Sequence, residues 1–227
     1  IISGNFDRES IRNDINLYFG GIENTETDLD EGLNEIPETS FDEIRMKEKL
    51  PNPILILSYV KPKFTDLPVK DAYALELLLE IMDGGFSSRF TSNIIDKKIA
   101  ISTFISHDLY TREKSIISIG AIPRRDVSLE NLKQSIINEF INVHSEGLLT
   151  KELHNTKARI IASNIYKFDS IFSQTMSVGQ LESRNLSWNL LDEYILNINA
   201  VTEQDIKDVA QKYIINNKVQ ISLIEPK

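Results

Sequence analysis

The stretch "YALELLLEIMDGGFSSRF", residues 73–90, decides how the rest of the chain is interpreted. Its first part is apolar almost all round, a pattern that is typical of a helix buried inside a domain. We expect this helix to cover residues 68–82. Glu76, Glu80 and Asp83 lie on one narrow stripe of it, which predicts an exposed helix edge rather than a metal or acid–base site.

The second part of the stretch predicts a sharp turn between two helices. Gly84 and Gly85 are expected to end the first helix, because glycine adopts positive φ at little cost. Ser87 is expected to cap a short second helix over residues 87–95, and Phe86 to pack in the corner between the two helices.

Outward from this turn, the apolar pattern indicates further strands and helices. Residues 99–108 and 114–122 are rich in β-branched side chains and are expected to form an antiparallel pair. The other expected strands are residues 1–6, 43–49, 53–60 and 218–226. In residues 43–49, polar and apolar side chains alternate, which is typical of a strand with one solvent-exposed face. The other expected helices are residues 8–19, 129–145, 150–165, a looser stretch over 169–199 that breaks near Gly179 and Asn185, and one that begins at Thr202.

Capping residues mark the ends of the C-terminal helices. Ser128 and Thr150 are expected N-caps, and Gly147 is expected to end the helix between them. Thr202 with Asp205 resembles a capping box. The order of elements predicts an α+β fold, in which one mainly antiparallel sheet has helices packed on one face.

Composition excludes several classes of protein. The 227 residues are 41% hydrophobic and 26% charged, enough for one large domain or a tightly joined pair. The absence of cysteine excludes disulfides, thiolate metal sites and a cysteine nucleophile. No apolar run reaches the ~20 residues that span a bilayer, and no basic patch with interleaved aromatic residues indicates nucleic-acid binding. The chain starts at Ile1 and lacks the pattern of a signal peptide, so we expect its natural start to be missing. The sequence is compatible with either the bacterial periplasm or the cytoplasm.

One segment carries the excess negative charge. Residues 23–43 hold nine of the 34 acidic residues and no basic residue, which leaves 25 acidic against 25 basic residues elsewhere. This composition is typical of a solvated linker. The alternative is a calcium site, but "DLDEG", residues 28–32, lacks the alternating ligands and the distant glutamate of an EF-hand loop.

Sequence motifs do not assemble a complete active site. His107, His144 and His154 lie on separate predicted elements, whereas a zinc site on a helix needs closely spaced histidines with a carboxylate. His107 stands beside Asp108, a pair that could orient a base, but no nucleophile motif accompanies it. The sequence contains no G-x-S-x-G elbow, P-loop or G-x-G-x-x-G fingerprint. We therefore expect no catalytic residue and no metal ligand in this chain.

Five segments resemble pitrilysin/insulinase-type zinc peptidases, and they follow one another along the chain in the order of that family. "ALELLLEIMDGGFSSRFTSNIIDKK" is similar to the family's element of helix, Gly-Gly, Phe-Ser-Ser-Arg and helix. "IISGNFDRESIRNDINLYFGGI" resembles the unit that closes the first half of those proteins, and "NPILILSYVKP" the strand after their interdomain linker. "LLTKELHNTKARIIASNI" resembles their long helix with a Glu-Leu opening, and "INAVTEQDIKDVAQKYIINNKVQISLIEP" their closing helix and strand.

The resemblance implies two related halves that enclose a chamber, each with a mitochondrial processing peptidase-like architecture. The first half of such proteins carries an H-x-x-E-H motif, whose glutamate activates a zinc-bound water. No H-x-x-E-H occurs here, so the chain is similar to the second, non-catalytic half, and zinc is expected in the missing or partner half. In that case residues 1–22 close the preceding half, residues 23–42 form the linker, and residues 43–227 form the C-terminal domain.

The resemblance also indicates where substrate contacts are lost. The family's second half often supplies an arginine and a tyrosine near the zinc, but Ile95 and Ile101 occupy these places in "NIIDKKIAIS", residues 93–102. Arg89 is no substitute, because it belongs to the separate Ser-Ser-Arg element. The remaining candidates for contact with the substrate chamber or the other half are Gly84, Gly85, Phe86, Ser87, Ser88 and Arg89.

The sequence therefore predicts a non-catalytic half that closes over a peptide substrate. Its expected partner is the N-terminal half of the same protein or a zinc-bearing homologous subunit. The alternative is a catalytically inactive subunit or an assembly module with no peptidase role, because fold does not determine function. The chain alone is expected to cleave nothing.

Overall fold

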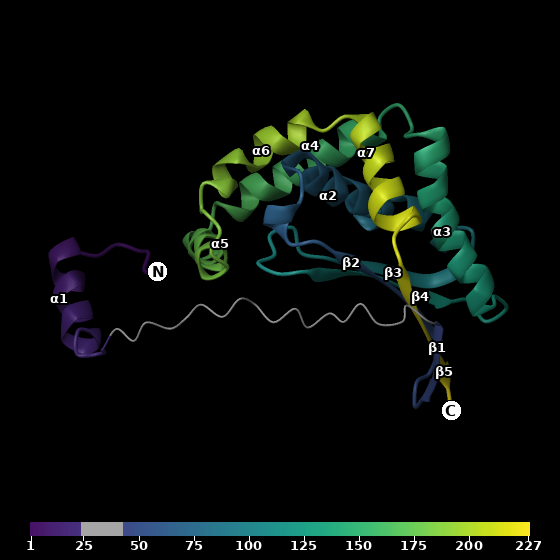
Figure 1. Cartoon of the computed structure of the whole chain (residues 1–227), viewed down its shortest axis with the longest axis horizontal. Coiled ribbons are helices and arrows are strands. Elements are labelled where there is room, and N and C mark those ends of the chain that lie inside the picture. Colours follow the sequence, from purple (N-terminus) through teal and green to yellow (C-terminus); the bar gives the residue numbers. More distant parts are fainter. Residues whose placement is uncertain (24–42) are drawn as a thin grey trace.

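The computed structural model describes residues 1–23 and 43–227 (Figure 1). In these residues one five-stranded sheet has the strand order β1-β5-β2-β4-β3. Its strands are β1 (Glu43–Glu48), β2 (Ile54–Lys61), β3 (Ala100–Ser106), β4 (Ser115–Pro123) and β5 (Val219–Pro226). Neighbouring strands are antiparallel except β1 and β5, which are parallel. The predicted antiparallel pair of β3 and β4 is confirmed.

The helices of residues 43–227 lie on one face of the sheet (Figure 1). The helices of the chain are α1 (Arg8–Phe19), α2 (Val69–Asp83), α3 (Leu129–Glu146), α4 (Glu152–Lys167), α5 (Ile171–Ser183), α6 (Leu190–Ala200) and α7 (Glu203–Ala210). Shorter helical turns cover Phe64–Asp66, Thr91–Ile95 and Gln211–Ile215. This arrangement confirms the predicted α+β class, with a mainly antiparallel sheet and helices on one side.

Helix α2 lies at the centre of the core. It packs against β3 and against helices α4, α6 and α7, and nine of its 15 residues are buried. Strand β2 supplies Leu55, Leu57 and Tyr59 to the same core and buries Lys61 on the same side, whereas the side chains that alternate with these are turned to the opposite face. Helix α2 is buried both on the side that faces the sheet and on the sides that face other helices. Its sequence is therefore apolar almost all round.

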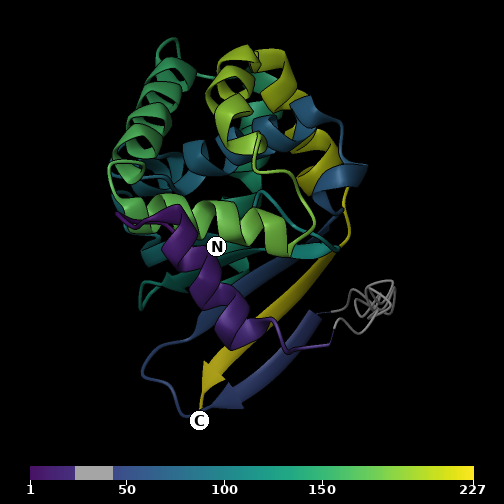
Figure 2. The same ribbon diagram turned by 90° about the vertical axis from the view of Figure 1, so that its left-hand side faces the viewer.

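None of the helices of residues 43–227 covers the second face of the sheet (Figure 2). A row of residues crosses it from strand to strand, because the strand register aligns Ile44 with Ser222, Ser222 with Ile56, Ile56 with Gly120 and Gly120 with Phe104. Phe104 lies over Gly120, where an added Cβ would stand 2.0 Å from its ring. Ile44 and Phe104 each keep 46% of their surface exposed, so this face is partly apolar.

The N-caps predicted at Ser128 and Thr202 are confirmed, and Asp7 is the N-cap of α1. Asp7 and Ser128 accept hydrogen bonds from the backbone N–H groups of Ser10 and Asn131. Thr202 and Asp205 form the reciprocal capping box of α7. Gly147 ends α3 with φ of 87°, a conformation that glycine adopts without strain.

Some sequence expectations at the N-terminal side were wrong. Residues 1–6 form no strand, because no strand of the described chain lies beside them to pair with. Strand β1 was expected to have one wet face, but all six of its residues are exposed, since it is the edge strand and no helix covers it. The predicted linker, residues 23–42, lies outside the described residues except for Glu23.

Two predicted helix signals in the C-terminal part were also wrong. Thr150 does not cap α4, whose N-cap is Lys151 without a side-chain hydrogen bond; the carboxylate of Glu152 instead accepts the N–H of Leu149. Gly179 does not interrupt α5, which runs through it to Ser183. The predicted break at Asn185 is confirmed by its φ of 57°.

Candidate functional site

The two glycines after α2 meet different physical requirements. Gly85 has φ of 125°, which residues with a Cβ rarely adopt. Gly84 is needed for space instead, because an added Cβ would stand 2.2 Å from the Oε2 atom of Glu80 and 2.3 Å from the Nη2 atom of Arg159. The turn is therefore shaped both by backbone conformation and by an ion pair that closes over it.

The side chains of the turn do not take their predicted places. Phe86 does not pack in the corner; it is 100% exposed, because the turn directs it away from the helices. Ser88, not Ser87, acts as the cap: its hydroxyl accepts the N–H of Thr91 at 3.3 Å, and Ser88 is buried. The Thr91 hydroxyl in turn donates to the carbonyl oxygen of Gly85 at 3.2 Å, which closes the turn.

Arg89 joins the turn to the start of α4. Its Nε and Nη2 atoms donate to the two carboxylate oxygens of Glu152 at 2.7 and 2.9 Å, and Nη2 also donates to the carbonyl oxygen of Gly147 at 2.9 Å. Both side chains of this pair are only 12% exposed. Arg89 and Glu152 come from two segments that each resemble the peptidase family, and the fold makes them partners in a two-point ion pair.

A cavity of about 270 Å³ lies beside this turn. Its lining includes Gly84, Ser87 and Ser88 from the turn and Lys151 and Glu152 from α4. Of the six candidate residues of the turn, Gly84, Ser87 and Ser88 line this cavity, and the other three do not.

The two isoleucines that were predicted to replace substrate contacts lie on either side of a tight turn. Ile95 ends the helical turn Thr91–Ile95 and is half-buried. Ile101 lies on β3 beside a register irregularity between Ala100 and Ser102 and is 47% exposed.

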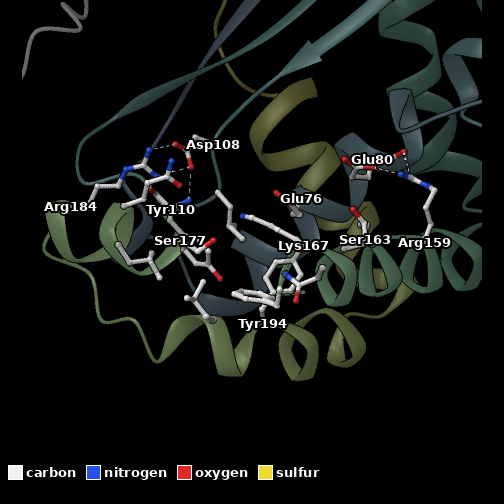
Figure 3. Close-up of a pocket in the computed structure, with 17 residues that line it drawn as sticks. Glu76, Glu80, Asp108, Tyr110, Arg159, Ser163, Lys167, Ser177, Arg184 and Tyr194 are labelled. Atoms are coloured by element: carbon white, nitrogen blue, oxygen red, sulfur yellow. Dashed lines mark hydrogen bonds and ion pairs between the residues drawn. The ribbon is translucent and has the colours of Figure 1, made fainter. Parts of the chain in front are cut away.

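A second, larger cavity of about 410 Å³ lies in the helical layer (Figure 3). Its walls come from α2, α4, α5, α6 and the connection between β3 and β4. Two ion pairs line it: Arg184 with Asp108, and Arg159 with Glu80, each with an N–O distance of 2.7 Å. The carboxyl of Glu76 also lines this cavity (Figure 3).

Glu76 was expected on an exposed helix edge, and this expectation was wrong. Its side chain is only 18% exposed, because α4, α6 and the β3–β4 connection enclose that side of α2. Burial and, to a smaller extent, the negative charge of Glu80 raise the pKa of Glu76 to about 7, and Lys61 acts in the opposite direction. Glu80 and Asp83 are half-buried too, and each has a partner: Arg159 for Glu80, and the Thr103 hydroxyl for Asp83.

His107 and Asp108, which are neighbours along the chain, have different partners in the structure. Asp108 binds Arg184 rather than His107, and the Nε2 atom of His107 lies 3.5 Å from the Oε2 atom of Glu76. Burial lowers the pKa of His107, and the positive charge of Lys61 lowers it further, so the imidazole is mainly neutral near pH 7. Lys61 is buried and donates to the carbonyl oxygens of Asp108 and Leu109.

The other two histidines lie elsewhere on the surface. The Nδ1 atom of His144 lies 3.2 Å from the carbonyl oxygen of Lys207, and His154 is exposed on α4. Within residues 1–23 and 43–227, no group of three His, Asp or Glu side chains is close enough to hold a metal ion. No helix in the same ranges is both long and apolar enough to cross a membrane.

Sequence reasoning missed the larger cavity because its lining residues are far apart along the chain. The one available signal was a charged residue, Glu76, on a helix otherwise typical of a core. The stripe of three acidic residues was interpreted as a solvated edge, and the sequence does not show that α4 and α6 cover that edge.

The ion pair between Arg89 and Glu152 yields a prediction about stability. Arg89→Gln and Glu152→Gln are each expected to lower the free energy of unfolding by about 3 kcal/mol, because each leaves a buried charge without its partner. The double variant should lose less than the sum of the two changes. Urea unfolding measures all three, with the exposed Arg125→Gln as a control that changes stability by less than about 0.5 kcal/mol. Additive losses would contradict a direct coupling.

The raised pKa of Glu76 predicts a pH-dependent effect of Glu76→Gln. The folded state binds the proton more tightly than the unfolded state, so wild-type stability falls as pH rises from the ordinary value of 4.5 to about 7. A glutamine at position 76 does not titrate, so the variant does not lose stability in this way as the pH rises. The advantage of the variant should grow by roughly 2–3 kcal/mol between pH 5 and pH 8 in urea unfolding. If the free energies of unfolding of the two proteins change equally with pH, the pKa of Glu76 is not raised.

Known proteins with related sequence or structure include bacterial proteases and their domains. "Uncharacterized zinc protease YmxG" of Bacillus subtilis is 24% identical over 226 residues, which are 99% of this chain and 53% of that protein. The chain thus spans about half the length of this relative.

Solved structures show the same fold at low identity. A protease from Helicobacter pylori has a TM-score of 0.77 and 18% identity, over 98% of this chain and 53% of its own. The periplasmic protease PqqL from Escherichia coli has a TM-score of 0.75 and 15% identity, over 99% of this chain and 25% of its own. The inactive peptidase domain of a putative zinc protease from Bordetella parapertussis has a TM-score of 0.68 and 14% identity, over 80% of this chain and 95% of its own.

The sequence profile described as "Peptidase M16 inactive domain" matches residues 1–160. These residues include the turn after α2, its ion pair with α4 and most of the sheet. Since the match spans more than half of the chain, this protein belongs to the peptidase M16 inactive-domain family.

Proposed function

We propose that this chain is the non-catalytic half of a pitrilysin-like zinc metallopeptidase and closes a peptide-binding chamber opposite a zinc-bearing half. The observation that carries the proposal is the apolar surface that the chain leaves open on the sheet. The family assignment and the incomplete coverage of the relatives support the same conclusion. The zinc-bearing half would supply the metal-activated water, and this chain would shape the space in which the peptide lies.

The uncovered face of the sheet is suited to enclose a partner or a peptide. Ile44, Met46, Phe104 and Ile116 are each more than 40% exposed on it. Large exposed apolar patches mark interaction sites, because water contact with such surface is unfavourable. A second half facing this side of the sheet would enclose a space with one apolar wall.

The N-terminal segment supports a division between two halves. None of the residues of α1 is buried, and Leu17, Tyr18 and Phe19 are more than 60% exposed. The segment contacts the C-terminal domain through the hydroxyls of Ser3 and Thr175. An amphipathic helix normally buries its apolar side chains, so residues 1–22 fit a helix that packs on the preceding half, as the sequence resemblance implies.

The turn after α2 is a further contact surface for the other half or for the peptide. Phe86 is fully exposed although it is large and apolar, and the residues behind it are held by the Arg89–Glu152 pair. An aromatic side chain on a rigid support loses little conformational freedom when a partner covers it. Ile95 and Ile101 would add apolar surface and no polar contact to the substrate.

The first test compares the full-length protein that contains this chain with the 227-residue chain alone. We expect the full-length protein to retain about one zinc ion after dialysis and to cleave an unstructured peptide, whereas the chain alone retains no zinc and cleaves nothing. Elemental analysis and peptide mass spectrometry provide the measurements. Equimolar zinc on the chain alone would refute the proposal. A full-length protein without zinc or cleavage would instead support an inactive partner subunit or assembly module.

The second test concerns Phe86. In the full-length protein, Phe86→Ser is expected to weaken peptide binding or association of the halves by about tenfold or more, since burying a phenylalanine contributes ~2 kcal/mol. The thermal stability of the chain alone should not change, because Phe86 has no contacts to lose there. Phe172→Ser, on the exposed face of α5, serves as the control. Unchanged binding and association would exclude Phe86 from both contact surfaces.

A further inference from the structure

The cavity of about 410 Å³ has an arrangement of charge that the peptidase role does not use. It opens among α2, α4, α5 and α6, within the helical layer and not on the uncovered face of the sheet (Figure 3). Its charged side chains are mostly paired within the cavity wall: Arg184 with Asp108, and Arg159 with Glu80. The carboxyl of Glu76 stands apart from both pairs.

Glu76 has spare capacity to accept hydrogen bonds. Its Oε2 atom is buried and has no hydrogen-bond partner among the described residues. The nearest base is His107, whose Nε2 atom lies 3.5 Å away and whose pKa is lowered by burial. The Tyr194 hydroxyl bonds the carboxyl of Glu76 but leaves the buried Oε2 atom unused, so a cation that entered the cavity would gain a strong interaction there. The last torsion of a glutamate side chain is broad, which lets the carboxyl turn toward such a ligand.

Ser177 provides a second, independent sign of a ligand site. It is 4% exposed on α5, lines the same cavity, and its hydroxyl has no hydrogen-bond partner among the described residues. Unpartnered buried hydroxyls are rare because desolvation of the group is not compensated. The cavity therefore contains two unused polar groups, one of them a carboxylate.

The remaining walls are suited to an apolar body. Leu109, Leu181 and Ile160 line the cavity together with the rings of Phe168 and Tyr194. Aromatic rings attract an ammonium group through their faces, and the aliphatic side chains favour hydrocarbon. A divalent metal ion fits less well, because hard cations need several oxygen ligands and the other carboxylates are already paired with arginine.

We infer that this cavity binds a small molecule that carries an ammonium group on an apolar body. The ammonium group binds the carboxylate of Glu76 and lies within reach of the Ser177 hydroxyl, and the apolar body packs among the leucine, isoleucine and aromatic side chains. This site is separate from the proposed peptide chamber, and it does not depend on whether the full-length protein is a peptidase.

The charge state of Glu76 makes binding depend on pH. An ammonium ligand needs the ionised carboxylate, which is a minor form at pH 6 and the main form at pH 8 if the pKa is about 7. The apparent association constant should therefore rise roughly tenfold from pH 6 to pH 8. Other titratable or charged groups surround Glu76 and its cavity: Lys61 on β2, Glu80 on α2, His107, Asp108 and Tyr110 after β3, Arg159 and Lys167 on α4, Arg184 directly after α5, and Tyr194 on α6.

Isothermal titration of the 227-residue chain with 2-phenylethylamine tests this inference. The neutral 2-phenylethanol, which has the same apolar body, serves as the matched probe. We expect the amine to bind at least tenfold more tightly than the alcohol at pH 8. Glu76→Gln should abolish this preference and the rise with pH, and Ser177→Ala should weaken amine binding by a smaller factor. Asp192→Asn, which removes one exposed negative charge outside the cavity, should leave the binding of the amine unchanged.

The outcomes separate the possibilities. Equal binding of amine and alcohol, or no binding of either, would overturn the inference. So would a Glu76→Gln variant that keeps the preference for the amine while its circular dichroism matches the wild-type chain. An equal loss in Glu76→Gln and Asp192→Asn would show a general effect of negative charge and would also overturn it.

Discussion

The burial of α2 is the constraint on which the rest of the structure depends. This helix packs against β3 on one side and against α4, α6 and α7 on the others, so almost every position on it must be apolar. Each acidic side chain that it carries then needs a partner from another element. Asp71 accepts from Lys212 and Tyr213, Glu80 from Arg159 and Asp83 from Thr103. These contacts join α2 to the C-terminal helical turns, to α4 and to β3.

Glu76 is the exception among these acids, and its environment follows from the same packing. It lies where α2 faces the β3–β4 connection, α4 and α6, which leave a cavity instead of supplying an arginine or lysine for it. Its carboxyl therefore has a raised pKa and an oxygen without a partner. We assign a ligand to this cavity because the unpartnered Ser177 hydroxyl lines it together with this carboxyl oxygen.

The structure divides its apolar residues between a closed core and two open surfaces. The core lies between the sheet and the helices, where residues such as Leu57, Leu78 and Phe140 are fully buried. The open surfaces are the second face of the sheet and the apolar side chains of α1. The turn with Phe86 adds an exposed ring held by the Arg89–Glu152 pair. A chain that folds one good core and still exposes such surfaces fits one half of a larger assembly, since exposed apolar surface is unfavourable unless a partner covers it.

The sequence by itself determined the fold class, the family and most of the local structure. Apolar periodicity, turn glycines and capping residues are local signals, so β3 and β4, the cap at Ser128 and the capping box at Thr202 could be predicted from neighbouring residues. The order of five family-like segments indicated the non-catalytic half, and the sequence profile of the family confirms it. Only the tertiary structure decided which side chains meet. It paired Arg89 with Glu152, exposed Phe86, and turned Glu76 from a supposed surface residue into a cavity carboxyl with a raised pKa. The physical reason is that burial and charge pairing depend on elements far apart along the chain, and the sequence around each residue does not show which of those elements will cover it.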